Sequence, residues 1–312
     1  MRLKVILMLK MKEFLASCTL CPRQCGANRT KGELGYCSTD SEPLVASITI
    51  HKGEEPALSG STGVCNVFFA HCNLSCCFCQ NHQISRNSNH SSQWIRDYET
   101  IIQRIVEILD RGIKILGFVS PTHQVPQMVT IIEMLNQIGY KPRVVYNSNG
   151  YDSPEVLRML YDYVDIYLPD IKYFDDELAV KYSHAPSYFS IATKVLKEMI
   201  WQKGTSLQLD DEGIVEQGVI VRHLVLPGHS ADSIRVLQEI SEISNNLTIS
   251  LMSQFQPSND SLNCIGRSVT KREYEVVVSE LKRMGFHRGW VQNMGSNTYY
   301  LPNFEKKNPF ND

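Results

Sequence analysis

Three cysteines in one short segment have the spacing of ligands to an inorganic cofactor. Cys72, Cys76 and Cys79 are separated by three and two residues, and Phe78 stands directly before the last of them. Thiolates are soft ligands that suit iron-sulfur clusters and zinc. A [4Fe-4S] cluster usually takes four cysteines, so three of them leave one iron open to a substrate or cofactor. The spacing therefore indicates a reactive cluster, with a zinc-binding loop or a chance grouping as the alternative.

A second group of four cysteines lies nearer the N-terminus, with spacings of two, three and eleven residues. Four thiolates suit a closed site, which is either structural zinc or a second cluster that transfers electrons. Both accept tetrahedral sulfur, so the spacing does not choose between them. Cys65 and Cys77 are expected to be small buried apolar residues. The four members of this group are Cys18, Cys21, Cys25 and Cys37.

The composition is that of an ordinary globular protein that works inside a cell. The 312 residues are 43% hydrophobic and 21% charged, and the net charge is -2. This balance argues against a nucleic-acid partner and against an anionic membrane surface. No apolar run approaches the 18 residues of a membrane span, and the first ten residues lack the pattern of a secretory signal. We expect a soluble, cytoplasmic protein with reduced thiols, not a disulfide-rich secreted one.

The elements that must position the cysteines alternate from residue 64 onward. Six short β-branched or apolar runs alternate with stretches of helical periodicity, which predicts a parallel sheet with right-handed crossovers. A closed eight-unit barrel takes about 250 residues, so six units predict an α/β fold with a partial (β/α)6 barrel, open on one side. The expected strands are 64–70, 115–119, 143–146, 164–168, 219–226 and 247–254. The expected helices are 98–109, 126–138, 154–161, 230–243 and 271–284, with an extra helix at 188–202 and a hairpin at 207–216.

Three regions follow from these elements. Residues 1–58 form a cysteine-rich N-terminal segment with a strand or hairpin at 44–51, residues 59–294 form the core domain, and residues 295–312 form a C-terminal tail. In barrels, function gathers at the C-terminal ends of the strands. The cysteine loop follows the first expected strand, and polar residues follow each of the others, so we expect the site at this edge.

The cysteine triplet, with its preceding aromatic, resembles the signature of the radical S-adenosylmethionine (SAM) enzymes. The chain also resembles the pyruvate formate-lyase activating enzymes, especially uncharacterised relatives with a cysteine-rich N-terminus. The resemblance implies a partial barrel and a [4Fe-4S] cluster on Cys72, Cys76 and Cys79 that binds SAM. It also implies one-electron cleavage of SAM to a 5′-deoxyadenosyl radical that abstracts hydrogen. The segments that carry it are 18–26, 35–37, 72–81, 121–123, 145–147, 165–172, 221–228 and 251–254.

The resemblance also implies which residues surround SAM. Asn147 and Ser148 occupy the turn after the third strand, where the family has an Asp-Thr-Asn-Gly sequence. Asp170 and Lys172 match the family's Asp-x-Lys motif, although a surface ion pair is the plainer alternative. The family's Gly-Gly-Glu motif after the second strand is replaced here by residues 120–123, so either the Thr122 hydroxyl or backbone carbonyls of this turn are expected to receive the SAM amine.

Three residues beside these motifs are open to two interpretations each. Arg222 and His223 alternate along one strand, so only one of them faces the barrel interior, and we expect Arg222 to do so. His123 is either a cap of the second helix or a cofactor contact. Met252 is either core packing or part of the site, and core packing is the commoner role of methionine.

The same resemblance implies the partners. Hydrogen would be abstracted from a glycine of a partner enzyme, and a one-electron donor such as flavodoxin or ferredoxin would supply the electron. The rival hypothesis is a non-catalytic iron-sulfur or zinc-binding scaffold or electron carrier, which would bind no SAM. Fold and cofactor are shared by enzymes with many substrates, so the sequence does not name the substrate.

Overall fold

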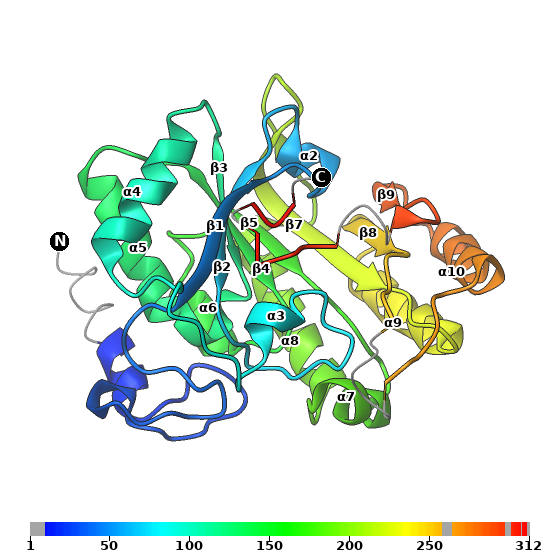
Figure 1. Ribbon diagram of the computed structural model, residues 1–312. Coiled ribbons are helices and arrows are strands. Elements are labelled where there is room, and N and C mark those ends of the chain that lie inside the picture. The colour runs from blue at the N-terminus through cyan, green and yellow to red at the C-terminus, as the bar shows by residue number, and fades with distance from the viewer. Residues whose placement is uncertain (1–9, 258–263, 297–300, 307, 311–312) are drawn as a thin grey trace.

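The computed structural model describes residues 10–257, 264–296, 301–306 and 308–310. One curved sheet passes through the described residues, and its strands follow one another in space largely in chain order (Figure 1). The strands are β1 (Val45–His51), β2 (Val64–Phe69), β3 (Ile115–Val119), β4 (Arg143–Ser148), β5 (Ile166–Pro169), β6 (Gln208–Leu209), β7 (Val215–Leu224), β8 (Thr248–Met252) and β9 (Gly289–Val291).

The sheet is parallel from β2 to β9, apart from the short β6, which pairs antiparallel with β7. The six predicted strands correspond to β2, β3, β4, β5, β7 and β8, and β1 adds an antiparallel strand at the β2 edge. In the described part of the chain β1 and β9 end the order without pairing to each other. The α/β fold with an open, partial barrel is therefore confirmed. Sequence analysis missed β9, because three residues are too few to show a period.

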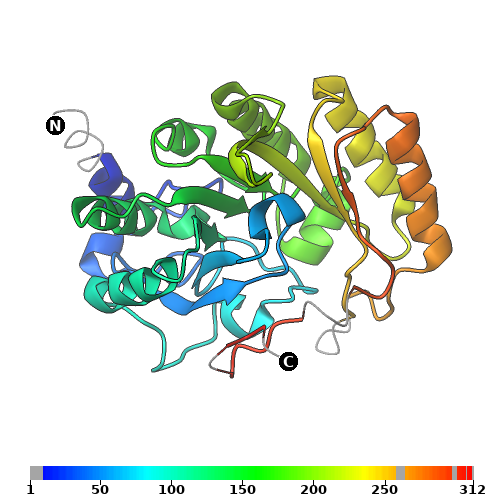
Figure 2. The same cartoon turned by 90° about the horizontal axis from the view of Figure 1, so that it is seen from above.

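Helices cover the outer side of the sheet, while the C-terminal segment lies on the inner side beside β1 (Figure 2). All the predicted helices are present, although the one expected at 154–161 ends at Arg158. The helices are α2 (Pro56–Ser59), α3 (His82–Ser85), α4 (Tyr98–Leu109), α5 (Val125–Gln137), α6 (Pro154–Arg158), α7 (Asp176–Ser183), α8 (Tyr188–Lys203), α9 (Ser230–Ile243) and α10 (Lys271–Arg283), with 3-10 turns η1 (Arg29–Lys31) and η2 (Pro121–Gln124).

Helix α4 illustrates how the sequence forms these elements. The Asp97 side chain accepts a hydrogen bond from the backbone N–H of Thr100 and so caps the first turn. Ile101, Ile105 and Ile108 recur at helical spacing and are buried. The helix therefore presents one apolar stripe to the sheet and a polar face to solvent.

The N-terminal and C-terminal segments pack on the barrel. Met11, Leu15 and Leu20 belong to the same buried cluster as the barrel strands and helices. Near the other end, Phe304 and Phe310 pack against Phe68 of β2. The segment expected as a tail thus contributes side chains to the packing, while the predicted domain boundaries at residues 58 and 294 stay predictions.

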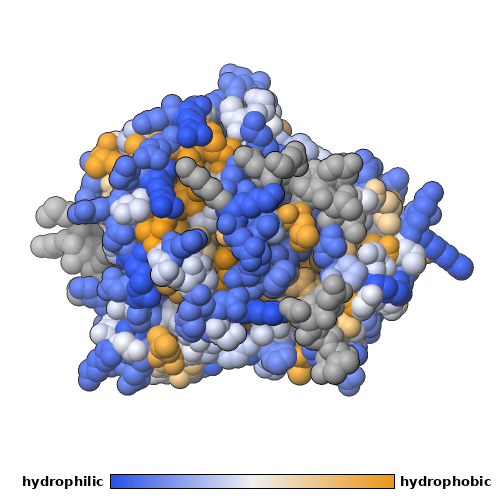
Figure 3. Space-filling view, viewed as in Figure 1, coloured by the Kyte–Doolittle hydropathy of each residue, from blue (hydrophilic) through white to orange (hydrophobic). Residues whose placement is uncertain are grey.

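The hydrophilic surface in Figure 3 agrees with a composition of 43% hydrophobic and 21% charged residues. Among the described residues no helix is both long and apolar enough to cross a membrane. The face in Figure 3 is mostly hydrophilic, with apolar residues in separate small patches. The first nine residues, on which the expectation about a secretory signal largely rests, lie outside the described residues.

Candidate cluster and cofactor site

The cysteine triplet lies on the loop between β2 and α3, at the C-terminal edge of the parallel sheet. Cys72 is buried, and Cys76 and Cys79 are half-buried. Two backbone bonds tie the loop to the end of α7: the N–H of Ser75 donates to the Ser183 carbonyl, and the N–H of Cys77 donates to the Tyr182 carbonyl. The loop is therefore held in place by a helix more than 100 residues further along the chain.

Each sulfur of the triplet accepts a hydrogen bond from a different neighbouring side chain. Such donors stabilise negative charge on sulfur, and hydrogen bonds to sulfur help set the potential of iron-sulfur clusters. The bonds run to Cys72 Sγ from Asn149 Nδ2 (3.4 Å), to Cys76 Sγ from Ser183 Oγ (2.9 Å) and to Cys79 Sγ from Ser85 Oγ (3.2 Å).

The environment of the triplet fits a cationic group. Burial raises the pKa of Cys72 to about 12 and that of Cys76 to about 11, although nearby Lys172 opposes the second shift. Thiols whose pKa is raised in this way ionise near neutral pH only when positive charge is brought to them, and iron brings it. In the described parts of the chain no three Cys, His, Asp or Glu side chains form a ready site for a single ion. A cubane cluster binds each cysteine through a different iron, so its ligands surround the cluster instead of meeting at one point. The three donor-bonded thiols thus fit a [4Fe-4S] cluster.

Behind the loop, Asp170 links two cations. Its carboxylate accepts a bond from Lys172 Nζ (2.6 Å) and another from Arg222 Nε (2.8 Å). Burial opposes ionisation of Asp170, but Arg222 and Lys172 outweigh it and hold its pKa below the ordinary value. Burial likewise opposes charge on Lys172, and Asp170 outweighs it, so the pKa of Lys172 is raised. The group is ionised and partly buried, unlike the surface ion pair considered as the alternative.

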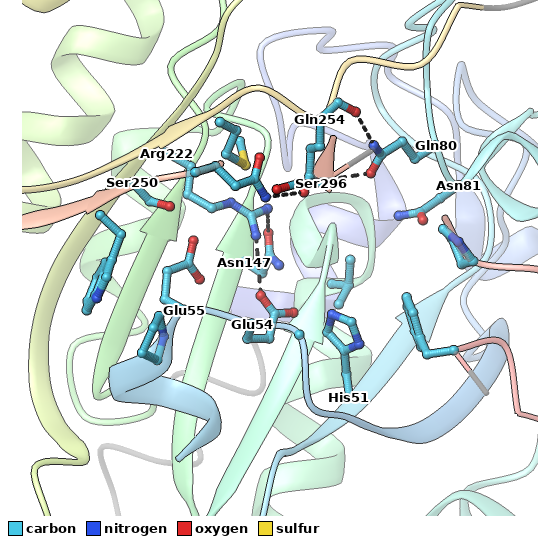
Figure 4. Close-up of a pocket in the computed structure, with 18 of the residues that line it drawn as sticks. His51, Glu54, Glu55, Gln80, Asn81, Asn147, Arg222, Ser250, Gln254 and Ser296 are labelled. Atoms are coloured by element: carbon cyan, nitrogen blue, oxygen red, sulfur yellow. Dashed lines mark hydrogen bonds and ion pairs between the residues drawn. The ribbon is translucent and has the colours of Figure 1, made fainter. Parts of the chain in front are cut away.

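Arg222 extends this group into a cavity. Its Nη2 donates to Asn147 Oδ1 (2.9 Å), and its Nη1 lies 3.4 Å from Glu54 Oε2 (Figure 4). The cavity has a volume of about 400 Å³ and lies inside the partial barrel. Strands β4, β7 and β8, the β1–α2 turn, the residues after Cys79 and the C-terminal segment all contribute to its wall. Among the lining residues are Asn147, Arg222, Ser250, Gln80, Gln254 and Phe310.

Residues of the β1–α2 turn complete the polar wall of the cavity, and sequence analysis missed them. Glu54, Glu55 and His51 line the cavity, and Glu55 Oε2 and His51 Nδ1 are buried without a hydrogen-bond partner among the described residues. Burial raises the pKa of Glu55 and lowers that of His51. The available signal was the acidic pair before Pro56, which stands inside a segment interpreted only through its cysteines.

Two predicted SAM contacts lie behind the cavity. The hydroxyl of Thr122 donates to Asp152 Oδ1 (2.6 Å), and the hydroxyl of Ser148 donates to the other oxygen of the same carboxylate. Tyr146 also donates to Asp152, which is buried and was not singled out from the sequence. Thr122 and Ser148, like the predicted contacts Asp170 and Lys172, do not line the cavity. Their roles toward SAM stay predictions, whereas Asn147 and Arg222 are brought together at the cavity.

The ambiguous residues are resolved by their partners. Arg222 faces the barrel interior, as predicted, and buried His223 lies 2.6 Å from the Ile171 carbonyl through Nδ1. His123 bonds the Ala70 carbonyl through Nε2 and does not line the cavity, and Met252 does line it. Burial lowers the pKa of His123 to about 3, so its ring is neutral.

The two remaining cysteines have different fates. Cys65 is fully buried, as predicted. The prediction that Cys77 is a buried apolar residue is wrong, because Cys77 is half-buried and disulfide-bonded to Cys264. The partners are 187 residues apart, so only the folded chain shows that their loops meet.

One family model matches the segment of the chain that carries most of this site. Residues 66–206 match the family model described as the radical SAM superfamily, and this segment contains the triplet, Asn147, Asp170 and Lys172. The match supports the radical SAM superfamily for this chain. The chain is also 29% identical to the uncharacterized protein MJ0674 of Methanocaldococcus jannaschii over 272 residues, which are 85% of this chain and 74% of that protein.

Two solved structures are similar to this chain over part of their length. One is HydG, a maturase of the [FeFe]-hydrogenase, with 16% identity, a TM-score of 0.48 and coverage of 71% of this chain. The other is Streptococcus suis SuiB bound to S-adenosylmethionine, with 10% identity, a TM-score of 0.47 and coverage of 74% of this chain. The chain spans about half the length of each, 49% of HydG and 50% of SuiB, and their activities stay their own.

Proposed function

We propose that this chain is a radical SAM enzyme that removes a hydrogen atom from a substrate held in the cavity of the partial barrel. The observation that carries the proposal is the triplet itself. Three cysteines with donor-bonded sulfurs lie at the C-terminal edge of a parallel sheet, beside a cavity with fixed polar groups. Sites of barrel proteins gather at this edge.

Cys72, Cys76 and Cys79 would hold a [4Fe-4S] cluster, and Asn147 and Arg222 would contact SAM. When bound, the cluster and SAM together supply one-electron cleavage to methionine and a 5′-deoxyadenosyl radical. Arg222 is fixed by Asp170 and Asn147, so its remaining donor capacity points at the cavity without reorganisation. Lys172 places positive charge near Cys76. Pro302 and Phe310 of the C-terminal segment line one side of the cavity.

Anaerobic reconstitution with iron and sulfide, followed by reduction with dithionite in the presence of SAM, tests this proposal. We expect 5′-deoxyadenosine from the native chain and none from Cys76→Ala. Cys65→Ala is the matched control, because Cys65 is a buried cysteine outside both groups. An intact cluster that cleaves no SAM would contradict the proposal and favour a non-catalytic scaffold or electron carrier.

We further propose that the hydrogen donor is a glycine of a partner protein and that a flavodoxin- or ferredoxin-type protein supplies the electron. The resemblance of segments 145–147, 165–172 and 221–228 to activating enzymes supports this finer proposal. A partner labelled with deuterium at glycine Cα would transfer deuterium into 5′-deoxyadenosine. Cleavage of SAM with no deuterium transferred from any glycine-labelled protein of the host proteome would contradict glycine as the hydrogen donor. That result would leave the proposed radical chemistry intact.

A further inference from the structure

Arg29 lies beside Cys18 of the N-terminal cysteine group and is fully buried. Its guanidinium donates to the backbone carbonyls of Asp40 and His123, with distances from 2.7 to 3.0 Å. Nη1 also lies 4.0 Å from Cys18 Sγ. Among the described residues no carboxylate forms an ion pair with it. Arg29 therefore carries a buried positive charge whose partners are neutral carbonyls and one cysteine.

A buried cation without a counter-charge is costly. Carbonyl dipoles replace only part of the stabilisation that an opposite charge gives to a buried ion. The neighbouring group able to supply negative charge is the cysteine set, which lies near Arg29 through Cys18. As ligands they are thiolates, and four thiolates outweigh the charge of a dipositive ion or cluster core.

The four cysteines are grouped by the fold of this segment. The N–H of Cys18 donates to the Ala27 carbonyl, and the N–H of Gly26 donates back to the Cys18 carbonyl. Cys21 lies within electrostatic reach of Cys37, Cys18 and Cys25. Cys18, Cys21 and Cys37 are buried and Cys25 is exposed, so the group reaches the protein surface through one ligand.

The inner side of this group packs on the radical site. Tyr36 lies within electrostatic reach of Cys72 and Cys76 of the triplet and of Cys21 of the N-terminal group. The guanidinium of Arg23 stacks 3.9 Å over the Tyr36 ring and donates to the Asn73 carbonyl of the triplet loop (3.0 Å). One tyrosine and one arginine thus bridge the two cysteine groups.

We propose that Cys18, Cys21, Cys25 and Cys37 hold a second iron-sulfur cluster that passes electrons to the cluster of the triplet. The exposed edge at Cys25 receives one electron from an external one-electron donor of the flavodoxin or ferredoxin class. The same electron then passes inward past Tyr36 to the triplet cluster, which is reduced as the second cluster is reoxidised, and no bond forms or breaks. The relay rests on the proposed function, whereas the cluster itself does not.

Metal analysis separates the second cluster from the radical chemistry. The native chain, reconstituted anaerobically, should hold about eight irons and eight sulfides, as two cubanes require. A Cys72→Ala/Cys76→Ala/Cys79→Ala variant should keep about four of each and show a cluster signal by electron paramagnetic resonance (EPR) after reduction. Zinc without sulfide in that variant, or no metal at all, would overturn the proposal even if the native chain cleaves SAM.

Rapid-freeze EPR tests the relay. Reduced flavodoxin is mixed with the native chain and with Cys37→Ala, and reduction of the triplet cluster is followed in time. We expect loss of the fast phase in Cys37→Ala, while dithionite still reduces the triplet cluster and shows that it is intact. If Cys37→Ala shows no cluster under dithionite, exposed Cys25→Ser replaces it. An unchanged fast phase would overturn the relay.

Discussion

Arg222 shows how one side chain can organise the candidate site. It bonds Asp170 and Asn147 and lies near Glu54, so a strand residue joins three elements at the cavity. Its guanidinium makes this possible because five donors lie in one rigid plane. The neighbouring Lys172 cannot replace it, since a single ammonium reaches fewer partners in fixed directions.

The first prediction concerns this arginine. Arg222→Met removes the cationic partner that the partly buried carboxylates of Asp170 and Glu54 share. We therefore expect the free energy of unfolding to fall by about 3 kcal/mol. Urea unfolding measures it. Arg158→Met is the matched control: Arg158 pairs with Glu198 at the surface, and such pairs contribute at most about 1 kcal/mol. Equal effects of the two substitutions would contradict the buried role of Arg222.

The second prediction concerns His223, whose pKa is lowered to about 4 by burial. In the unfolded chain its pKa returns to about 6.5, so the unfolded state binds a proton that the folded state refuses. Stability from this residue is therefore complete above pH 6.5 and falls as pH drops toward 4, by up to about 1.4 kcal/mol per pH unit. Urea unfolding from pH 7 to 5 should show a shallower fall in His223→Gln. Equal pH slopes in the native chain and the variant would show that the His223 ring binds its proton equally in the folded and unfolded states.

At the scale of elements, the contact between β2 and β3 sets the position of the cavity wall. Asn66 of β2 lies beside Gly117 of β3 and donates through Nδ2 to Glu54 Oε1 (2.8 Å). A Cβ on residue 117 would overlap the Asn66 side chain. Because residue 117 has no side chain, Asn66 of β2 has room to bond Glu54 and so to hold the β1–α2 turn at the cavity.

The third prediction follows from this contact. Gly117→Ala forces Asn66 from its place, and we expect a loss of about 1–3 kcal/mol in the free energy of unfolding, as in other overpacked cores. Thermal and urea unfolding measure the loss. Gly266→Ala, where an added Cβ meets open space, should be close to neutral. A neutral Gly117→Ala would mean that the strands separate at little cost.

At the scale of the whole molecule, the N-terminal segment and the barrel form one packed body. Met11, Leu15, Cys18 and Leu20 share a buried cluster with barrel residues, and Arg29 bonds the His123 carbonyl across the junction (2.7 Å). Loss of order in the cysteine segment would therefore remove packing from the barrel. Loss of order in the barrel would likewise remove packing from the cysteine segment.

The fourth prediction is that removal of iron with a chelator lowers the melting temperature of the whole chain in one transition. Metal binding contributes to folding wherever its ligands assemble only in the native state. Shared packing makes the two parts melt together. Calorimetry of the loaded and stripped chain measures it. Two separate transitions, only one of them sensitive to metal, would contradict the coupling.

The sequence by itself determined the repeating elements and the ligands on a single loop. Strand and helix alternation is a local period, and cysteines two or three residues apart stay close in any fold, so both are visible along the chain. The open parallel sheet, the triplet at its C-terminal edge and the inward direction of Arg222 were all predictable on this basis.

Only the tertiary structure decided the contacts between distant segments. Glu54 contacts Arg222, which lies 168 residues later in the sequence, and Cys77 forms a disulfide with Cys264, which lies 187 residues later. The Thr122 hydroxyl bonds Asp152 and does not line the cavity. A hydroxyl or carboxylate chooses its partner by burial and direction, which depend on how the sheet curves and which loops cover it. The sequence therefore identified the candidate cluster ligands, and the fold decided which side chains face the cavity.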